Sequence, residues 1–247
     1  MHSTVSSLGA CALLGIAWRG AAQPDGSPSR APATFELGKV TVRKAERTVS
    51  FPAVVNMRTG VVEYAVVTTA GKTHESVFRT EAQPEHIHVA LLLLNAKPAS
   101  TEVFPPDLNI APPGEAVGIE VGWSQDGSEV RRPLEDFIVT TNNQQPLSRG
   151  PWIYNGSYVS NGRFLAQDEG SIVSVHIDPA ALCNSPRAGR DNDDLNHVNS
   201  ATLPPAAQPL QIYIKLQPEP PPASQRTAGP REPPSSKGNQ PLSVPPP

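Results

Sequence analysis

The sequence is poor in cysteine and lacks the common catalytic motifs. Cys11 and Cys183 are the only cysteines in 247 residues. An iron–sulfur cluster needs about four thiolates, so the chain alone cannot hold one. No G-x-S-x-G elbow, P-loop or G-x-G-x-x-G pattern occurs. The zinc-protease pattern H-E-x-x-H begins at His74 and Glu75 but fails because Phe78 stands in place of the second histidine.

The chain also lacks a basic run or a basic helical face. It carries 20 basic and 23 acidic residues, for a net charge of −3. Nucleic-acid binding normally requires a clustered positive charge, so we expect no nucleic-acid partner. The 29 prolines argue against long helices, because proline cannot donate a backbone hydrogen bond.

No apolar stretch reaches the length of about 20 residues that a transmembrane helix needs. The run Leu8–Trp18 is instead typical of the apolar region of a signal peptide, and Gly20 and Ala22 fit a cleavage site. We therefore predict a signal peptide over 1–22 and an exported protein, periplasmic or extracellular. The alternative is a lipoprotein anchored through Cys11, in the stretch "LGAC".

Composition divides the remaining chain into three parts. Residues 23–33 form a Pro/Gly/Ser-rich linker, and residues 218–247 are proline-rich with few apolar side chains. Such a tail cannot bury enough surface to offset its ordering entropy, so we predict that it is disordered. Residues 34–217 are expected to fold as a single domain.

The pattern of residues 34–217 predicts an α+β domain. Alternating, β-branched stretches predict strands in 34–55, 61–69, 73–80, 116–124, 151–177 and 210–216. "PEHIHVALLLLNAK" predicts one main helix over about 84–96, ending before Pro98. A short helix is predicted at about 178–183, with Asp178 as its cap. The expected fold is a mostly antiparallel sheet with the main helix packed on it.

The stretch from Gly71 to Pro98 contains three of the six histidines. On the predicted strand, His74 and Ser76 share one face and Glu75 points to the other. On the predicted helix, His86 and His88 lie roughly 200° apart, so one ion could not bind both.

Two interpretations of these residues stay open. His74, Glu75 and Ser76 could meet His86 or His88 at the start of the helix. His74 and one of those two histidines, with Glu75 or Glu85 as the oxygen ligand, could then hold a divalent metal ion. Alternatively, the histidines make local hydrogen bonds around a turn and a helix end. We predict no cofactor.

The stretch "PWIYNGS" is the second candidate surface. Trp152 and Tyr154 share a strand face, and Asn155 and Ser157 follow them. Aromatic rings beside amide and hydroxyl groups can bind a sugar or a peptide. The alternative is that Trp152 packs in the core, with its indole N–H bonded to a carbonyl.

The stretch "DNDDLN" resembles a calcium loop. An EF-hand needs glycine at the sixth position and glutamate at the twelfth, where this chain has Asn196 and Thr202. Looser calcium binding through Asp191, Asp193 and Asp194 remains an alternative to a solvated acidic loop.

Several stretches together resemble the YdjY domain of predicted exported bacterial proteins. They are "VSFPAVVNMRTGVVEYAVVTTAGKTHESVF", "HIHVALLLLNAKP", "PWIYNGS" and "DEGSIVSVHIDPAAL". The resemblance implies one exported domain and supplies no activity, ligand or catalytic residue.

These observations favour a non-enzymatic binding or interaction module whose partner is an envelope protein or polymer. The alternative is a histidine- or metal-dependent envelope hydrolase that uses His74, Glu75 and Ser76 with His86 or His88.

Overall fold

The computed structural model describes residues 33–217, except residues 102 and 143. The predicted signal peptide (1–22), the predicted lipidation site Cys11 and the predicted tail (218–247) lie outside the described residues. All but the last residue of the predicted linker (23–33) lies outside them as well.

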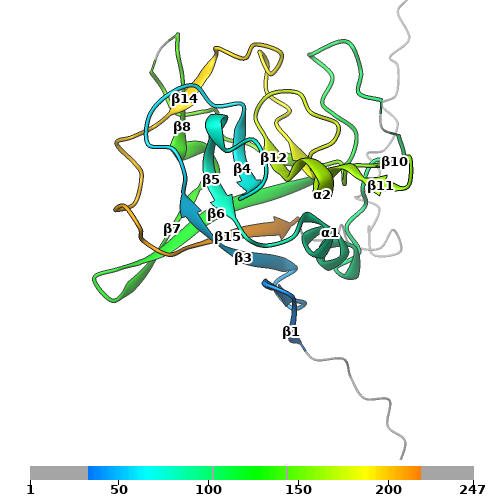
Figure 1. The fold of residues 1–247 in the computed structure, drawn as a ribbon, viewed down its shortest axis with the longest axis horizontal. Coiled ribbons are helices and arrows are strands. Elements are labelled where there is room, and N and C mark those ends of the chain that lie inside the picture. The colour runs from blue at the N-terminus through cyan, green and yellow to red at the C-terminus, as the bar shows by residue number, and fades with distance from the viewer. Residues whose placement is uncertain (1–32, 102, 143, 218–247) are drawn as a thin grey trace, which may run out of the picture. The chain divides into compact units, whose positions relative to one another are not determined.

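Eight strands close into a barrel, shown in Figure 1. The closure is made by β3 and β5, which pair at Val54 with Arg79 and at Val55 with Phe78. In order around the barrel, the strands are β3 (Thr48–Val55), β15 (Leu210–Leu216), β6 (Glu115–Gln125), β9 (Trp152–Tyr154), β13 (Cys183–Asn184), β12 (Ser171–Ser174), β4 (Tyr64–Thr68) and β5 (Ser76–Thr80).

The predicted α+β fold is therefore wrong. The alternating pattern shows which side chains of a strand face the core, but it does not show which strands pair. The segment after β4 shows that strand pairing can differ from the order that the sequence suggests. We expected "AGK" to form a turn and 73–80 to return beside the preceding strand. Instead β5 runs parallel to β4, with Tyr64 opposite Ser76, because residues 69–75 lead the chain back along β4.

Shorter strands extend the barrel. β1 (Thr34–Leu37) and β2 (Val40–Arg43) continue outward from β3, and β7 (Ser128–Pro133) pairs with β6. Two further pairs lie apart from this sheet: β8 (Ile138–Thr140) with β14 (Asn196–Val198), and β10 (Val159–Ser160) with β11 (Arg163–Phe164). Single 3-10 turns occur at η1 (Thr73–Glu75) and η2 (Leu134–Phe137).

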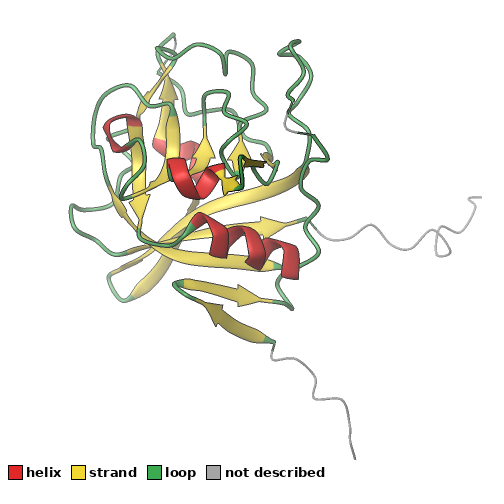
Figure 2. Cartoon of the chain, turned by 45° about the vertical axis from the view of Figure 1, so that its right-hand side comes forward, coloured by secondary structure: helices red, strands yellow, loops and turns green. Residues whose placement is uncertain are grey.

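The main predicted helix is present as α1 (Pro84–Leu93), packed against β2, β3 and the second helix. Figure 2 shows it as the longest helix, beside the strands of the barrel. It ends earlier than expected because Asn95 adopts a left-handed conformation with φ 62°. The N–H of Ala96 then donates to the carbonyl of Leu91 at 3.0 Å, a helix ending in which asparagine commonly replaces glycine.

The predicted helix at 178–183 is absent, and Cys183 with Asn184 forms β13 instead. The Asp178 carboxylate accepts the N–H of Ala180 at 2.9 Å, and the Asp178 carbonyl accepts the N–H of Ala181 at 3.1 Å. This single turn does not continue, because the next residues pair with β9 and β12.

The second helix, α2 (Leu165–Glu169), lies where we expected a strand. It ends at Gly170, whose φ of 69° is left-handed. A Cβ at this position would collide with Thr68 Oγ1 and would lie 2.8 Å from the Cα of Gly71. Only glycine fits this close approach between α2 and the turn after β4.

Aromatic and β-branched side chains fill the barrel. Phe51, Phe78 and Ile212 are fully buried, and the Phe78 ring meets Phe137 edge-on, with 5.2 Å between centroids. Cys183 is also fully buried, and this burial raises the pKa of its thiol.

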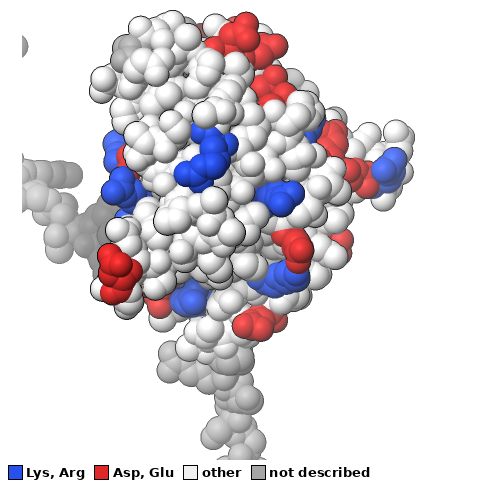
Figure 3. All heavy atoms as spheres, turned by 60° about the vertical axis from the view of Figure 1, so that its left-hand side comes forward, with Lys and Arg blue, Asp and Glu red and all other residues white. Residues whose placement is uncertain are grey.

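Charge is dispersed over one face of the molecule. On the face in Figure 3, basic and acidic residues of the described part are interspersed among uncharged ones, without a continuous patch of either sign. None of the helices in the described part of the chain has the length and apolar character needed to span a membrane.

Candidate functional site

The residues of the "THES" stretch face different surroundings. His74 lies in η1 rather than on a strand, and its side chain is 79% exposed, with Nε2 3.6 Å from Glu75 Oε2. Ser76 opens β5 and is fully buried, and its hydroxyl donates to the Lys72 carbonyl at 2.6 Å. The expected common face of His74 and Ser76 is therefore absent, because the 3-10 turn rotates the backbone before the strand begins.

The two helical histidines also contact different neighbours. His86 packs against Gly38, in the turn between β1 and β2. Its Nδ1 is buried without a hydrogen-bond partner among the described residues. His88 lies on the other side of α1, where Nδ1 is 2.8 Å from the Tyr154 hydroxyl and the ring is 5.0 Å from that of Phe164.

Burial lowers the pKa of His88 and raises the pKa of Tyr154. Both shifts favour the uncharged form, and the tautomer of the imidazole sets which of the two groups donates their shared hydrogen bond. Within residues 33–101, 103–142 and 144–217, no group of three His, Cys, Asp or Glu side chains is placed to hold a metal ion.

The predicted platform residues are mostly internal. Trp152 and Tyr154 are fully buried, so neither ring offers a face for a sugar or a peptide. The indole nitrogen of Trp152 has no hydrogen-bond partner within the described part, contrary to the carbonyl that we expected. Ser157 has a φ of 58°, and its hydroxyl accepts the N–H of Ala166 at 3.0 Å in the first turn of α2.

Asn155 belongs to a polar network that connects distant stretches of the chain. Its amide oxygen accepts from Asn184 Nδ2 at 2.9 Å, and Asn184 Oδ1 accepts the N–H of Asp178 at 2.9 Å. The Asp178 carboxylate accepts from the Tyr64 hydroxyl at 3.0 Å, and Lys72 donates to that hydroxyl at 2.5 Å. Each polar side chain in this series thus already has a partner within the protein.

An acidic group lies next to this network. Burial and the nearby Glu75 raise the pKa of the Glu63 carboxylate, while His176 and Lys72 oppose the shift. His176 Nε2 is 3.8 Å from Asp193 Oδ1. Of the predicted calcium loop, Asp191, Asp193 and Asp194 are all exposed.

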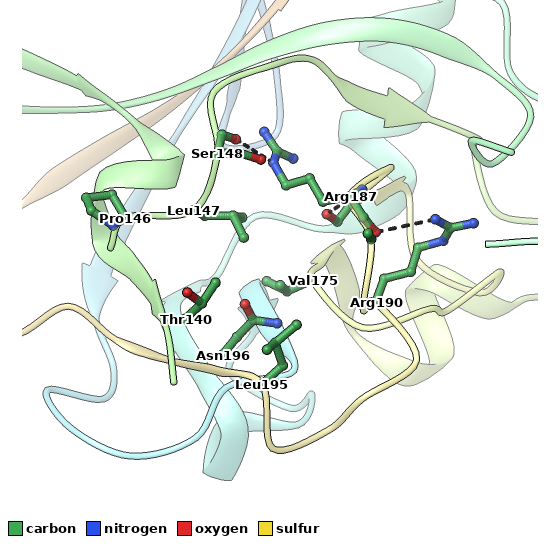
Figure 4. Close-up of a pocket in the computed structure, with 11 residues that line it drawn as sticks. Thr140, Pro146, Leu147, Ser148, Val175, Arg187, Arg190, Leu195 and Asn196 are labelled. Carbon is green, nitrogen blue, oxygen red and sulfur yellow. Dashed lines mark hydrogen bonds between the residues drawn. The ribbon is translucent and has the colours of Figure 1, made fainter. Parts of the chain in front are cut away.

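A pocket of about 240 Å³ lies between the β8–β14 pair and the loop that follows β13 (Figure 4). The residues that matter for its chemistry are Thr140, Leu147, Val175, Ser185, Arg187 and Asn196. Composition gave no indication of this pocket, because its wall is assembled from strand and loop residues that are far apart in the sequence.

Arg187 forms one side of the pocket. Its Nε donates to the Ser148 carbonyl at 2.7 Å, and its Nη2 donates to Glu135 at 2.6 Å and to the Gly150 carbonyl at 3.1 Å. The guanidinium carbon lies 4.7 Å from the centre of the Trp152 ring. Nη1 is buried and has no hydrogen-bond partner among the residues described.

Asn196 approaches the same pocket from β14. It is only 4% exposed, and its Oδ1 has no donor within the described residues. Figure 4 shows its side chain directed toward Leu147 and Val175. A buried acceptor without a donor costs about 1–3 kcal/mol, so a ligand that donates to Asn196 would relieve that cost.

The fold is a closed β-barrel domain, and its pocket has a wall of both polar and apolar side chains. The chain belongs to the YdjY domain family, whose model matches residues 40–215. Neither the search of curated proteins nor the search of solved structures found a match.

Proposed function

We propose that this protein is a non-enzymatic binding module, exported to the cell envelope, and that the Arg187–Asn196 pocket is its ligand site. The observation that carries the proposal is the pair of buried, unpartnered polar atoms in the pocket wall, Arg187 Nη1 and Asn196 Oδ1. Binding sites typically combine an apolar lining with a few polar groups that orient the ligand.

The predicted catalytic candidates support binding rather than hydrolysis. A serine nucleophile needs a base within hydrogen-bond reach. The Ser76 hydroxyl donates instead to a backbone carbonyl, while His74 lies in η1 with its side chain exposed. No observation favours the hydrolase alternative.

A thermal-shift screen of the full chain tests the ligand site. Small carboxylates, phosphates, sugars and amines are added separately, and the melting temperature is measured. Ala188 is exposed and lines the pocket, so Ala188→Phe is expected to cover the opening. At least one compound class should raise the melting temperature of the wild type and leave that of Ala188→Phe unchanged.

Ala201→Phe is the matched control, because Ala201 is also exposed but is not among the residues that line the pocket. It should respond to ligands as the wild type does. The ligand-site proposal is wrong if every compound class gives the same shift in all three proteins.

His74→Ala tests the hydrolase alternative through metal content. The purified wild type and the variant are both expected to contain no stoichiometric zinc, copper or nickel by elemental analysis. Zinc bound one-to-one in the wild type and lost in His74→Ala would favour the enzyme.

Export is tested by the intact mass of the protein recovered from cell fractions. Cleavage after Ala22 should give a periplasmic or extracellular chain that begins at Gln23. A lipid-modified chain that begins at Cys11 would support the lipoprotein alternative. An uncleaved chain retained in the cytoplasm would contradict export.

A further inference from the structure

We infer that the pocket binds the C-terminal residue of a peptide, through a carboxylate, the adjacent amide N–H and a small apolar side chain. This inference rests on the proposed function and adds the chemical class of the ligand. Three properties of the pocket wall lead to it: its excess positive charge, its unpartnered donor and acceptor, and its apolar side chains.

The buried charges around the pocket are unbalanced. Two guanidiniums, Arg187 and Arg190, belong to its wall. Among the described residues, Glu135 is the buried carboxylate beside them, and it is paired with Arg187 at 2.6 Å. Arg190 is 2% exposed, and the hydrogen bonds of its guanidinium go to backbone carbonyls, among them Leu108 at 2.6 Å and Ile110 at 2.8 Å. Asp191 and Asp107 act on the Arg190 guanidinium through space, and no ion pair with it occurs among the described residues. Two guanidiniums beside a single paired carboxylate favour an anionic ligand.

The unpartnered atoms fit a carboxylate next to an N–H group. Arg187 Nη1 is a donor without an acceptor within the described residues, and guanidinium–carboxylate hydrogen bonds are among the strongest in proteins. The Ser185 hydroxyl accepts the N–H of Arg187 at 3.3 Å, so its own proton can be donated to the same anion. Asn196 Oδ1 is an acceptor and needs a ligand donor.

Much of the remaining lining is apolar. Leu147, Val175 and Leu195 line the pocket. Its volume of about 240 Å³ equals roughly eight water molecules at ~30 Å³ each. That space accommodates one residue with a short apolar side chain.

A peptide end fits this wall better than a free amino acid does. A free amino acid would bring an ammonium group into a wall whose buried carboxylate is already paired with Arg187. A peptide brings a neutral amide N–H, which Asn196 can accept without adding positive charge. The experiment below compares these two sources of the same carboxylate.

The test is calorimetric titration of the full chain with three probes: N-acetyl-L-alanine, its C-terminal amide, and L-alanine. N-acetyl-L-alanine should bind, and the amide should bind at least about tenfold more weakly, since it lacks the charge-assisted hydrogen bond. L-alanine should also bind at least about tenfold more weakly. If the amide binds as tightly as the acid, the carboxylate is not recognised and the inference is wrong. Equal binding of L-alanine and the acid contradicts recognition of a peptide end.

Two variants locate the binding. Asn196→Leu removes the acceptor at nearly constant size and should weaken N-acetyl-L-alanine binding at least about tenfold. Its melting temperature should not fall, because an unpartnered polar atom is replaced by an apolar one. Ala188→Phe should abolish binding, and Ala201→Phe should leave it unchanged. Unchanged binding in Asn196→Leu or Ala188→Phe would overturn the inference.

The outcome distinguishes this inference from the proposed function. If N-acetyl-L-alanine does not bind while another compound class still gives a shift that Ala188→Phe removes, the peptide inference is wrong and the ligand site stands. If no class gives such a shift, both are wrong.

Discussion

The buried ion pair between Arg187 and Glu135 should control the stability of the pocket wall. The two side chains are 9% and 5% exposed. Arg187→Met removes the guanidinium but keeps much of the side-chain length. The Glu135 carboxylate then remains buried without its cation, and the Ser148 and Gly150 carbonyls lose their donor.

The size of the effect follows from these contacts. Removing one partner of a buried ion pair typically costs about 3–5 kcal/mol, most of it from the charge left behind. Ser148 and Gly150 are exposed, so water can satisfy their carbonyls. We therefore expect Arg187→Met to lower the free energy of unfolding by ~3–5 kcal/mol. The double variant Arg187→Met/Glu135→Leu should recover most of that loss, because apolar replacement of a whole pair is often neutral.

Urea unfolding of the full chain, followed by tryptophan fluorescence, measures both values. Trp152 lies beneath Arg187 and reports on this region directly. Arg149→Met is the matched control, since Arg149 pairs with Asp136 at 2.6 Å while its side chain is 58% exposed. An exposed pair contributes only ~0–1 kcal/mol. A loss below about 1 kcal/mol in Arg187→Met, or a double variant as unstable as the single one, would refute the reasoning.

Three further predictions concern a histidine, a glycine and a carboxylate. Burial lowers the pKa of His88. Its contribution to stability is therefore present above about pH 6.5, the ordinary pKa of histidine, and is lost as pH falls through the folded-state pKa. In a pH series of unfolding free energies, His88→Phe should lose less stability at acid pH than the wild type does. Gly170→Ala should lower the urea-derived free energy of unfolding by ~1–3 kcal/mol, through left-handed strain and the collision with Thr68. Burial and Glu75 raise the pKa of the Glu63 carboxylate. Its contribution to stability is therefore present below the unfolded-state pKa and is lost as pH rises through the folded-state pKa. Glu63→Gln should raise the free energy of unfolding by ~0.2–1 kcal/mol at pH 7, and by less at pH 4.

Each of these predictions has a control. His74→Phe alters an exposed histidine and should keep the wild-type pH profile. Gly127→Ala also places alanine at a positive φ, 78°, but nothing lies within 4 Å of the added Cβ, so it should lose less than Gly170→Ala. Glu46→Gln, at an exposed position, should change stability equally at both pH values. The histidine argument is wrong if His88→Phe loses as much stability at acid pH as the wild type. The glycine argument is wrong if both glycine variants lose the same free energy of unfolding. The carboxylate argument is wrong if Glu63→Gln is less stable than the wild type at pH 7.

Local periodicity alone predicted α1 and the inner face of that helix. Ile87, Ala90, Leu91 and Leu94 recur at helical spacing, and all four are buried. The last strand, 210–216, was likewise predicted with the bounds that β15 has. These elements could be predicted because a continuous apolar face appears in the order of neighbouring residues.

The helix end and the failed second helix show the limit of local patterns. Pro98 is a general stop signal, but α1 ends where Asn95 adopts a left-handed conformation. The N–H of Asn95 donates to the Leu92 carbonyl, and the N–H of Ala96 donates to the Leu91 carbonyl. Asp178 does start a turn, yet pairing of Cys183 with Tyr154 and Val173 extends the chain. Strand pairing across the barrel outweighs a weak local helix preference.

The sequence by itself therefore determined which segments have apolar faces, where one helix forms and that family membership is recognisable over residues 40–215. Only the tertiary structure decided that β3 meets β5 and closes the barrel, that Asn155 joins Lys72 through a hydrogen-bonded series, and that Arg187 and Asn196 share a pocket. The physical reason is that pairing order and loop placement depend on contacts between residues far apart in the chain, and such contacts leave no periodic signal in the local sequence.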